Sequence, residues 1–133
     1  MSRHERYGTR DLTFSQWHRT LSDNATCIDL DLLEYCRRCR QPLAMLELAR
    51  DVGQAFKPTT VLEQLAKKAM VPAFLIIYKL EAGSIGQCRM RRIYPEPTPL
   101  KMVNIDAVGR WIESLHAKCP CLAYSCRSES DQK

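Results

Sequence analysis

Residues 27–49, CIDLDLLEYCRRCRQPLAMLELA, constrain the fold more than any other stretch of this chain. They read as two β-strands joined by a short basic turn. Asp29 and Asp31 stand at positions i and i+2 of the first strand, so both carboxylates should point to one face. The second strand, PLAMLELA, is almost wholly apolar and carries Glu47 near its end. The stretch therefore predicts a β-hairpin with a buried second strand.

The acidic residues of this hairpin are candidate metal ligands. A carboxylate inside a buried strand is costly unless it is paired with a cation or bound to a metal ion. Acids at the ends of neighbouring strands can share a divalent cation, and carboxylate oxygens suit Mg²⁺ or Mn²⁺. Asp29, Asp31 and Glu47 are therefore candidate ligands of such a cation. The alternative is an edge hairpin whose acids face water.

Helices are expected on both sides of this hairpin in the sequence. Capping-box patterns predict helix starts at Thr13 and Thr60, because Gln or Glu follows three residues later. A last helix should begin near Asn104 or Asp106. Helical spacing gives each an apolar face, formed by Phe14, Trp17 and Leu21 in the first, Val61, Leu62, Leu65, Ala69 and Met70 in the second, and Val108, Trp111, Ile112 and Leu115 in the last.

Two more strands are expected after the second helix. AFLIIYKL, residues 73–80, is mostly apolar, as a central strand buried on both faces would be. QCRMRRIY, residues 87–94, alternates, so Cys88 and Met90 should lie on one face and arginines on the other. A helix between the second and third strands implies a crossover and a mixed sheet. The predicted fold class is α/β, a mixed four-stranded sheet flanked by helices in the order α-β-β-α-β-β-α.

The length and composition fit one domain. A chain of 133 residues with 45% hydrophobic residues supports one modest core. Within it we distinguish a basic arm (1–10), a core (11–94), a proline-rich linker (95–103) and a C-terminal helix with a cysteine-rich segment (104–126). The first residues are polar and the apolar runs are too short to cross a membrane. A cytoplasmic location is expected, where cysteines are typically thiols or metal ligands rather than disulfides.

The cysteines form a second constellation. Cys36 and Cys39 make a CxxC pair in the hairpin turn, which can direct two thiolates at one tetrahedral zinc ion. Cys119 and Cys121, with Cys126 nearby, supply a candidate second half, and a shared zinc would fasten the last helix to the sheet. Unrelated surface thiols are the alternative, and a thioredoxin-like redox pair is the least supported. Two cysteines in the expected strands are interpreted as core residues, namely Cys27 and Cys88.

Basic side chains gather in groups, and the formal net charge is +5. Such groups can contact a nucleic-acid backbone, or they can form an ordinary solvated surface. No aromatic residues interleave them, so duplex or branched DNA is favoured over a single strand. The candidate nucleic-acid-binding residues are Arg37, Arg38 and Arg40 in the turn, Arg89, Arg91 and Arg92 in the last strand, His18 and Arg19 beside the first helical stripe, and Arg3, Arg6 and Arg10 in the arm.

These segments together resemble a known group of proteins. A helix with FSQWHR, then IDLDLLEY, PLAMLELA, a helix and PAFLIIY resemble the PD-(D/E)XK nuclease superfamily. The likeness is closest to small phage resolvase-like proteins with a WHR helix, and it covers roughly residues 7–94. It implies a restriction-endonuclease-like core in which Asp31 (or Asp29) and Glu47 bind the metal.

One position departs from the pattern of that superfamily. The lysine expected two residues after Glu47 is replaced by Ala49. In such nucleases this lysine orients the attacking water or stabilises the developing charge. Lys57, at the start of the second helix, and Lys68, on that helix, are candidate substitutes, although each could simply be solvated.

Two function classes are therefore open. The first is a resolvase-like, metal-dependent DNA endonuclease that hydrolyses phosphodiesters with Mg²⁺-activated water. The second is a non-catalytic, zinc-containing module that binds nucleic acid or protein on the same fold. The intact acids favour the first class, and Ala49 favours the second. DNA is the expected partner, no membrane is expected, and a homodimer stays open.

Overall fold

A computed structural model of the chain describes residues 11–54 and 57–122. Its centre is one five-stranded sheet in the order β1-β2-β3-β4-β5. β2 and β3 run parallel, and every other neighbouring pair is antiparallel, so the predicted mixed sheet is confirmed. The strands are β1 (Leu32–Tyr35), β2 (Pro42–Arg50), β3 (Ala73–Glu81), β4 (Ser84–Tyr94) and β5 (Lys101–Asn104).

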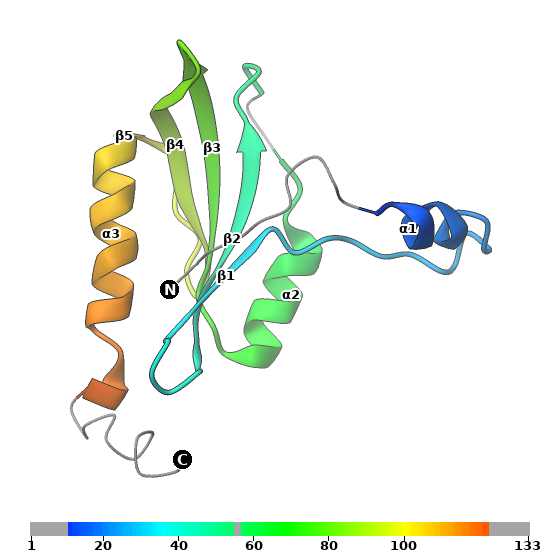
Figure 1. Cartoon of the computed structure of the whole chain (residues 1–133), viewed down its shortest axis with the longest axis horizontal. Helices are drawn as coiled ribbons and strands as arrows, with labels where there is room; N and C mark the ends of the chain where they lie inside the picture. The colour runs from blue at the N-terminus through cyan, green and yellow to red at the C-terminus, as the bar shows by residue number, and fades with distance from the viewer. Residues whose placement is uncertain (1–10, 55–56, 123–133) are drawn as a thin grey trace.

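Helices cover both faces of this sheet. α2 (Thr60–Ala69) connects the parallel strands β2 and β3, and α3 (Ile105–Ala117) follows β5. Figure 1 shows α2 and α3 on opposite sides of the sheet. The short helix α1 (Thr13–His18) stands apart from these layers, and a 3-10 turn, η1 (Pro120–Leu122), follows α3. The α/β class is therefore confirmed, and the described residues form a sandwich with a projecting N-terminal segment.

The core under α2 is narrower than the sequence predicts. Leu62 and Ala66 are buried against alternate residues of the central strands, which are Met45, Leu75, Ile77 and Ile93. Leu62 and Ala66 are four residues apart, so α2 touches the sheet along a single line. Of the predicted face only Leu62 is buried; Leu65 and Ala69 are exposed, and so are Val61 and Met70, at 59% and 81%. Met70 is the left-handed C-cap, where the chain already leaves the helix.

The core under α3 matches its prediction. Val108, Trp111, Ile112 and Leu115 pack on Ala44, Leu46, Phe74, Ile76 and Cys88. The rings of Phe74 and Trp111 meet edge to face at 4.5 Å, a favoured geometry for aromatic pairs. The Asn104 side chain accepts a hydrogen bond from the Ala107 N–H, which confirms the predicted start of this helix.

The fifth strand corrects the predicted four-stranded sheet and the predicted linker. Residues 101–104 pair with β4 from Met90 back to Gln87. The prolines that suggested a linker end at Pro99, so they do not interrupt this pairing. Val103 packs in the core under α3, and the burial of this side chain helps to hold residues 101–104 against β4.

The first strand is shorter than predicted, and this changes where the acids lie. β1 begins only at Leu32, so Asp29 and Asp31 belong to the extended segment that leads into it. Cys27, predicted to be a core residue, is exposed in the same segment. The predicted capping boxes are also wrong, because the N-caps are Leu12 and Thr59 and neither makes a side-chain cap bond.

Candidate acidic pocket and four-cysteine cluster

Beyond the start of β1, side chains instead of a strand bond to the outer edge of β2. Leu32 pairs with Leu46, so β2 continues past the start of β1 without a strand partner on that side. At Leu48 the backbone N–H donates to Asp31 Oδ2 at 2.8 Å. The carbonyl of the same residue accepts from Lys57 Nζ at 2.9 Å. The Asp31 carboxylate and the Lys57 ammonium group thus make the hydrogen bonds to Leu48 that the backbone of a neighbouring strand would otherwise make.

Glu47 and Lys57 form an ion pair beside this edge. Glu47 lies on the α2 side of β2, because the flanking alternate residues Met45 and Ala49 pack in the α2 core. Its Oε2 is 2.7 Å from Lys57 Nζ, and the two side chains are only 18% and 29% exposed. The pairing offsets the cost of burying the Glu47 carboxylate in the sheet.

Most of the predicted catalytic residues line one open pocket of about 470 Å³. We call it the acidic pocket. The predicted catalytic residues that line it are Asp29, Asp31, Glu47 and Lys57. Ile28, Leu48 and residues 58–62 form the rest of its lining. Asp31 and Glu47 each use one oxygen in the bonds above. Over residues 11–54 and 57–122, their other oxygens, Oδ1 and Oε1, make no further hydrogen bond or ion pair. The three carboxylates do not form a closed metal cage in the described part of the chain.

Lys68 does not reach the acidic pocket. It is exposed near the C-terminal end of α2, whereas the first residues of that helix line the pocket. Lys68 comes eight positions after Thr60 in the helix, which is about 12 Å along the axis. Of the two candidate lysines, the fold therefore brings Lys57, and not Lys68, to the acids.

The arginines of β4 are engaged within the protein. Arg89 forms an ion pair with Asp51 at 3.1 Å and donates to the carbonyl of Gln54 at 2.7 Å. The N–H of Gly53 and then the Arg89 guanidinium hold the pKa of Asp51 below its usual range. Two neighbours of Arg89 are also bonded, Arg91 to the Thr59 hydroxyl at 3.0 Å and Arg92 to the Glu96 carbonyl at 2.8 Å. Arg91 therefore approaches the acidic pocket through Thr59, one of its lining residues.

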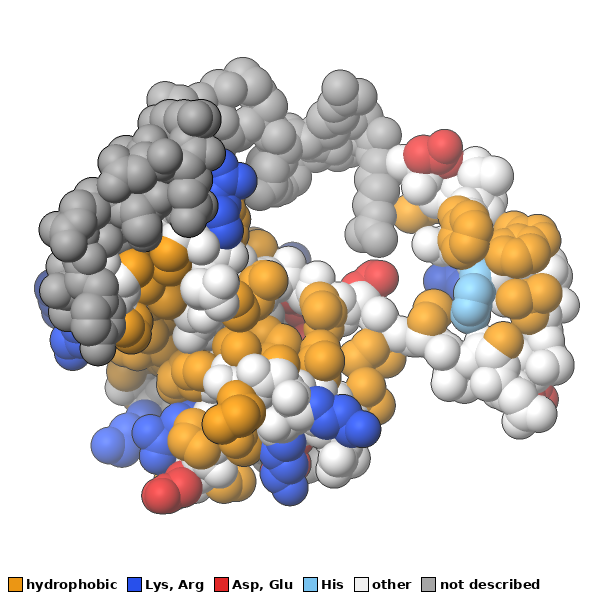
Figure 2. All heavy atoms as spheres, turned by 90° about the horizontal axis from the view of Figure 1, so that it is seen from below, with side chains coloured by type: hydrophobic (Ala, Val, Ile, Leu, Met, Phe, Trp, Pro, Cys, Tyr) orange, Lys and Arg blue, Asp and Glu red, His pale blue; other side chains and the backbone are white. Residues whose placement is uncertain are grey.

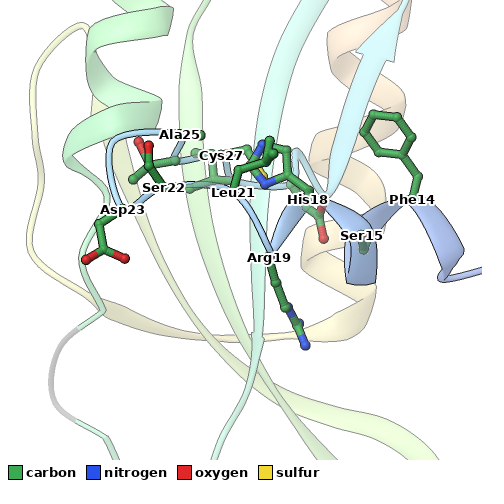
Figure 3. A pocket seen from close by; sticks show the side chains of 12 residues that line it. Phe14, Ser15, His18, Arg19, Leu21, Ser22, Asp23, Ala25 and Cys27 are labelled. Atoms are coloured by element: carbon green, nitrogen blue, oxygen red, sulfur yellow. The ribbon is translucent and has the colours of Figure 1, made fainter.

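The other predicted nucleic-acid-binding residues lie elsewhere. Arg37, Arg38 and Arg40 are exposed in the turn between β1 and β2, at the opposite end of that hairpin from Asp31. His18 and Arg19 line a separate open pocket of about 650 Å³ in the projecting segment. There His18 Nδ1 is 3.7 Å from Cys27 Sγ, and Arg19 extends away from that contact (Figure 3). Arg3, Arg6 and Arg10 lie outside the described residues.

The projecting segment also exposes apolar side chains. The stripe predicted on the first helix is present only in part, because α1 ends at His18 and Leu21 lies beyond it. Phe14, Trp17 and Leu21 are all exposed, and Phe14 is 72% exposed. Figure 2 shows hydrophobic side chains gathered on this segment. Nothing in the described residues covers them.

Four cysteines from distant parts of the chain meet as predicted. We call Cys36, Cys39, Cys119 and Cys121 the four-cysteine cluster; their sulfur atoms all lie within 4.8 Å of one another. Cys36 and Cys121 are 3.6 Å apart at sulfur, as are Cys39 and Cys119. These are free thiols rather than disulfides, and together they could hold one metal ion. The remaining predicted neighbour, Cys126, lies outside the described residues.

The backbone of the hairpin turn favours the thiolate form of Cys36. The N–H of Cys39 is the main cause that lowers the pKa of Cys36 to about 6; the N–H of Arg38 adds to it, while burial opposes it. Arg40 has a positive φ of 65°, and its N–H donates to the Cys36 carbonyl at 2.7 Å, so the turn folds back tightly. The N–H of Gln41 lowers the pKa of Cys39, but burial and the sulfurs of Cys119 and Cys36 raise it overall. A metal ion would supply the positive charge that several close thiolates need.

Some contacts at these sites had no signal in the sequence. His116 Nε2 lies 2.7 Å from Glu34 Oε1 and joins α3 to β1 beside the four-cysteine cluster. Asp51, which pairs with Arg89, stands in a loop that gave no prediction. Both contacts join segments far apart in the chain, so only the three-dimensional register reveals them.

Comparison with family models, curated proteins and solved structures found no match to this chain. Within residues 11–54 and 57–122, no helix has the length and apolar character needed to cross a bilayer.

Proposed function

We propose that this protein is a metal-dependent DNA endonuclease and that its reaction centre is the acidic pocket. The observation that carries the proposal is the distance of 2.7 Å between Lys57 Nζ and Glu47 Oε2. The superfamily that the sequence resembles needs a lysine close to this glutamate, and Ala49 cannot provide it. Lys57 reaches the same carboxylate from the loop before α2, so the cation is displaced in sequence but present in space.

The chain's own groups can bind and orient a phosphodiester in this pocket. Lys57 presents an ammonium group that can donate to a phosphoryl oxygen as negative charge develops there. The first residues of α2 line the same pocket, and a helix N-terminus favours an anion. The Thr59 hydroxyl, which Arg91 contacts, adds a polar group at that wall.

In this proposal the acids of the pocket would hold a hard divalent cation, which their oxygen donors suit. Asp31 Oδ1 and Glu47 Oε1 are carboxylate oxygens of the kind that Mg²⁺ or Mn²⁺ prefers, and Asp29 lines the same pocket. When bound, Mg²⁺ supplies positive charge that stabilises the negative charge developing on the phosphate. Asp31 is held in place by the Leu48 N–H, and Glu47 by Lys57, so both ligands are oriented beforehand.

A second candidate function follows from the four-cysteine cluster. Four sulfurs at these separations suit a tetrahedral ion, since a Zn–S bond of about 2.3 Å gives S–S edges of about 3.8 Å. We propose that the cluster binds Zn²⁺ as a structural ion. With a structural zinc and with Ala49 in place of the usual lysine, the same fold can serve as a non-catalytic module that binds nucleic acid or protein.

A cleavage assay separates the two candidates. Supercoiled plasmid, a branched junction and single-stranded DNA are each incubated with Mg²⁺, Mn²⁺ or EDTA. We expect metal-dependent cleavage of duplex or branched DNA, abolished by Glu47→Gln and unaffected by Glu113→Gln, an exposed carboxylate on α3. DNA binding without cleavage under every condition would instead establish the binding module.

A further inference from the structure

β1 has little to hold it in place on its own. It has four residues, and β2 is its one neighbour among the described strands. Its register shifts between Glu34 and Tyr35, and the side chains of Leu32, Leu33 and Tyr35 are exposed. A pair of strands of this length is marginal without further support.

The C-terminal end of β1 is tied to the end of α3. Cys36 follows the last residue of β1 directly and contacts Cys121, while Cys39 contacts Cys119. Glu34, inside β1, pairs with His116 at 2.7 Å. Figure 1 shows the β1–β2 turn and η1 at the same end of the molecule.

The other end of β1 leads directly to the acidic pocket. Asp31 immediately precedes Leu32, and its carboxylate accepts the Leu48 N–H. Only the four residues of β1 lie between Asp31 and Cys36. Because so short a strand opens as a unit, freeing the turn should also free Asp31.

Contacts between thiol groups alone would hold the β1–β2 turn only weakly to the segment that follows α3. An S–H group is a poor hydrogen-bond donor, whereas a tetrathiolate metal ion contributes directly to the folding free energy. We infer that Zn²⁺ bound by the four-cysteine cluster clamps the β1–β2 turn to the end of α3, and that this clamp keeps Asp31 bonded to Leu48. The inference rests on the zinc assignment proposed above but not on catalysis. In it, the four-cysteine cluster fixes the position of Asp31 in the acidic pocket.

The Leu48 amide reports on this device without any cleavage. Its exchange with solvent deuterium, measured by NMR on the full chain, follows the bond to Asp31 directly. Stripping zinc with a chelator should speed exchange at Leu48 and in β1 by about tenfold or more, because local opening becomes easier. Amides between β3 and β4 should keep their protection. Asp31→Ala should give fast exchange at Leu48 with or without zinc.

Variants and metal content complete the test. Elemental analysis should find about one zinc per chain, as one tetrathiolate site requires. Cys36→Ser should reproduce the chelator result, while Cys27→Ser, an exposed cysteine outside the cluster, should leave exchange unchanged. If Cys36→Ser does not fold, the chelator experiment on the unaltered chain decides. Zinc-free but folded protein, unchanged exchange at Leu48 after stripping, or loss of protection throughout the sheet would each overturn the inference.

Discussion

Lys57 Nζ bridges two neighbouring residues of β2, lying 2.7 Å from the Glu47 carboxylate and 2.9 Å from the Leu48 carbonyl. A single flexible side chain thereby ties the loop before α2 to the open edge of the sheet. The same edge holds Asp31 through the Leu48 N–H. The acidic pocket therefore lies where β2 extends beyond β1 and where side chains make the hydrogen bonds to its free backbone groups.

The Glu47–Lys57 pair should be coupled energetically. Removing one partner leaves a partly buried charge, so Glu47→Gln or Lys57→Met should each cost about 1–3 kcal/mol of unfolding free energy. A double-mutant cycle by chemical denaturation should give a coupling energy of about 1 kcal/mol or more. Glu63 and Lys67, an i,i+4 pair at 4.0 Å on α2, provide the control. Their coupling should be about 0.3 kcal/mol, and equal values for the two pairs would contradict the buried character of the first.

Asp51 and Arg89 predict a specific dependence of stability on pH. The pKa of Asp51 is lowered from 3.8, chiefly by the Gly53 N–H and by Arg89, so its charged form is favoured in the folded state. The stabilisation is therefore present above the usual value and is lost as the pH falls through the folded pKa.

Denaturation of the unaltered chain and of Asp51→Asn tests this. The variant should be less stable near neutral pH, and the difference should shrink as the pH falls below 3.8, the usual pKa of an aspartate. Asp23→Asn, in the exposed turn after α1, should change stability little at either pH. A difference for Asp51→Asn that stays constant down to acid pH would show that its charge is not what stabilises the fold.

The strong local patterns predicted the fold well. The stripe from Val108 to Leu115 and the capping residue Asn104 fixed α3, because the pattern there is long and regular. The Cys36-x-x-Cys39 spacing likewise predicted the meeting with Cys119 and Cys121.

Predictions that depended on partners far along the chain failed more often. Nothing local to Lys101–Asn104 shows that β4 has a free edge, so β5 was missed. Asp29 and Asp31 alternate like strand residues, but β1 starts only at Leu32, opposite Leu46. The sequence favoured Lys57 over Lys68 only slightly, and the position of α2 on the sheet is what separates them. The pairing of Glu34 with His116 depends on the same arrangement.

DNA affinity should depend on salt through the exposed arginines of the β1–β2 turn. The arginines of β4 are half-buried, whereas Arg37, Arg38 and Arg40 are exposed to solvent. Each phosphate that the protein no longer neutralises should reduce the slope of log affinity against log salt by about 0.9. Replacing all three by alanine should flatten the slope measured by fluorescence anisotropy, and Arg110→Ala on α3 should not. An unchanged slope in the triple variant would move the DNA-binding surface away from this turn.

The proposed reaction depends on Lys57 in place of the missing lysine, and single-turnover cleavage of duplex or branched DNA in Mg²⁺ tests this role. Lys57→Ala should lower the rate by about 10²-fold or more, as the loss of other groups that stabilise developing charge does. Lys68→Ala, on the exposed part of α2, should leave the rate unchanged. Both variants are compared at equal bound fraction, so that a loss of affinity is not counted as a loss of rate. Cleavage by Lys57→Ala at the rate of the unaltered chain, or an equal loss in Lys68→Ala, would contradict a catalytic role for Lys57.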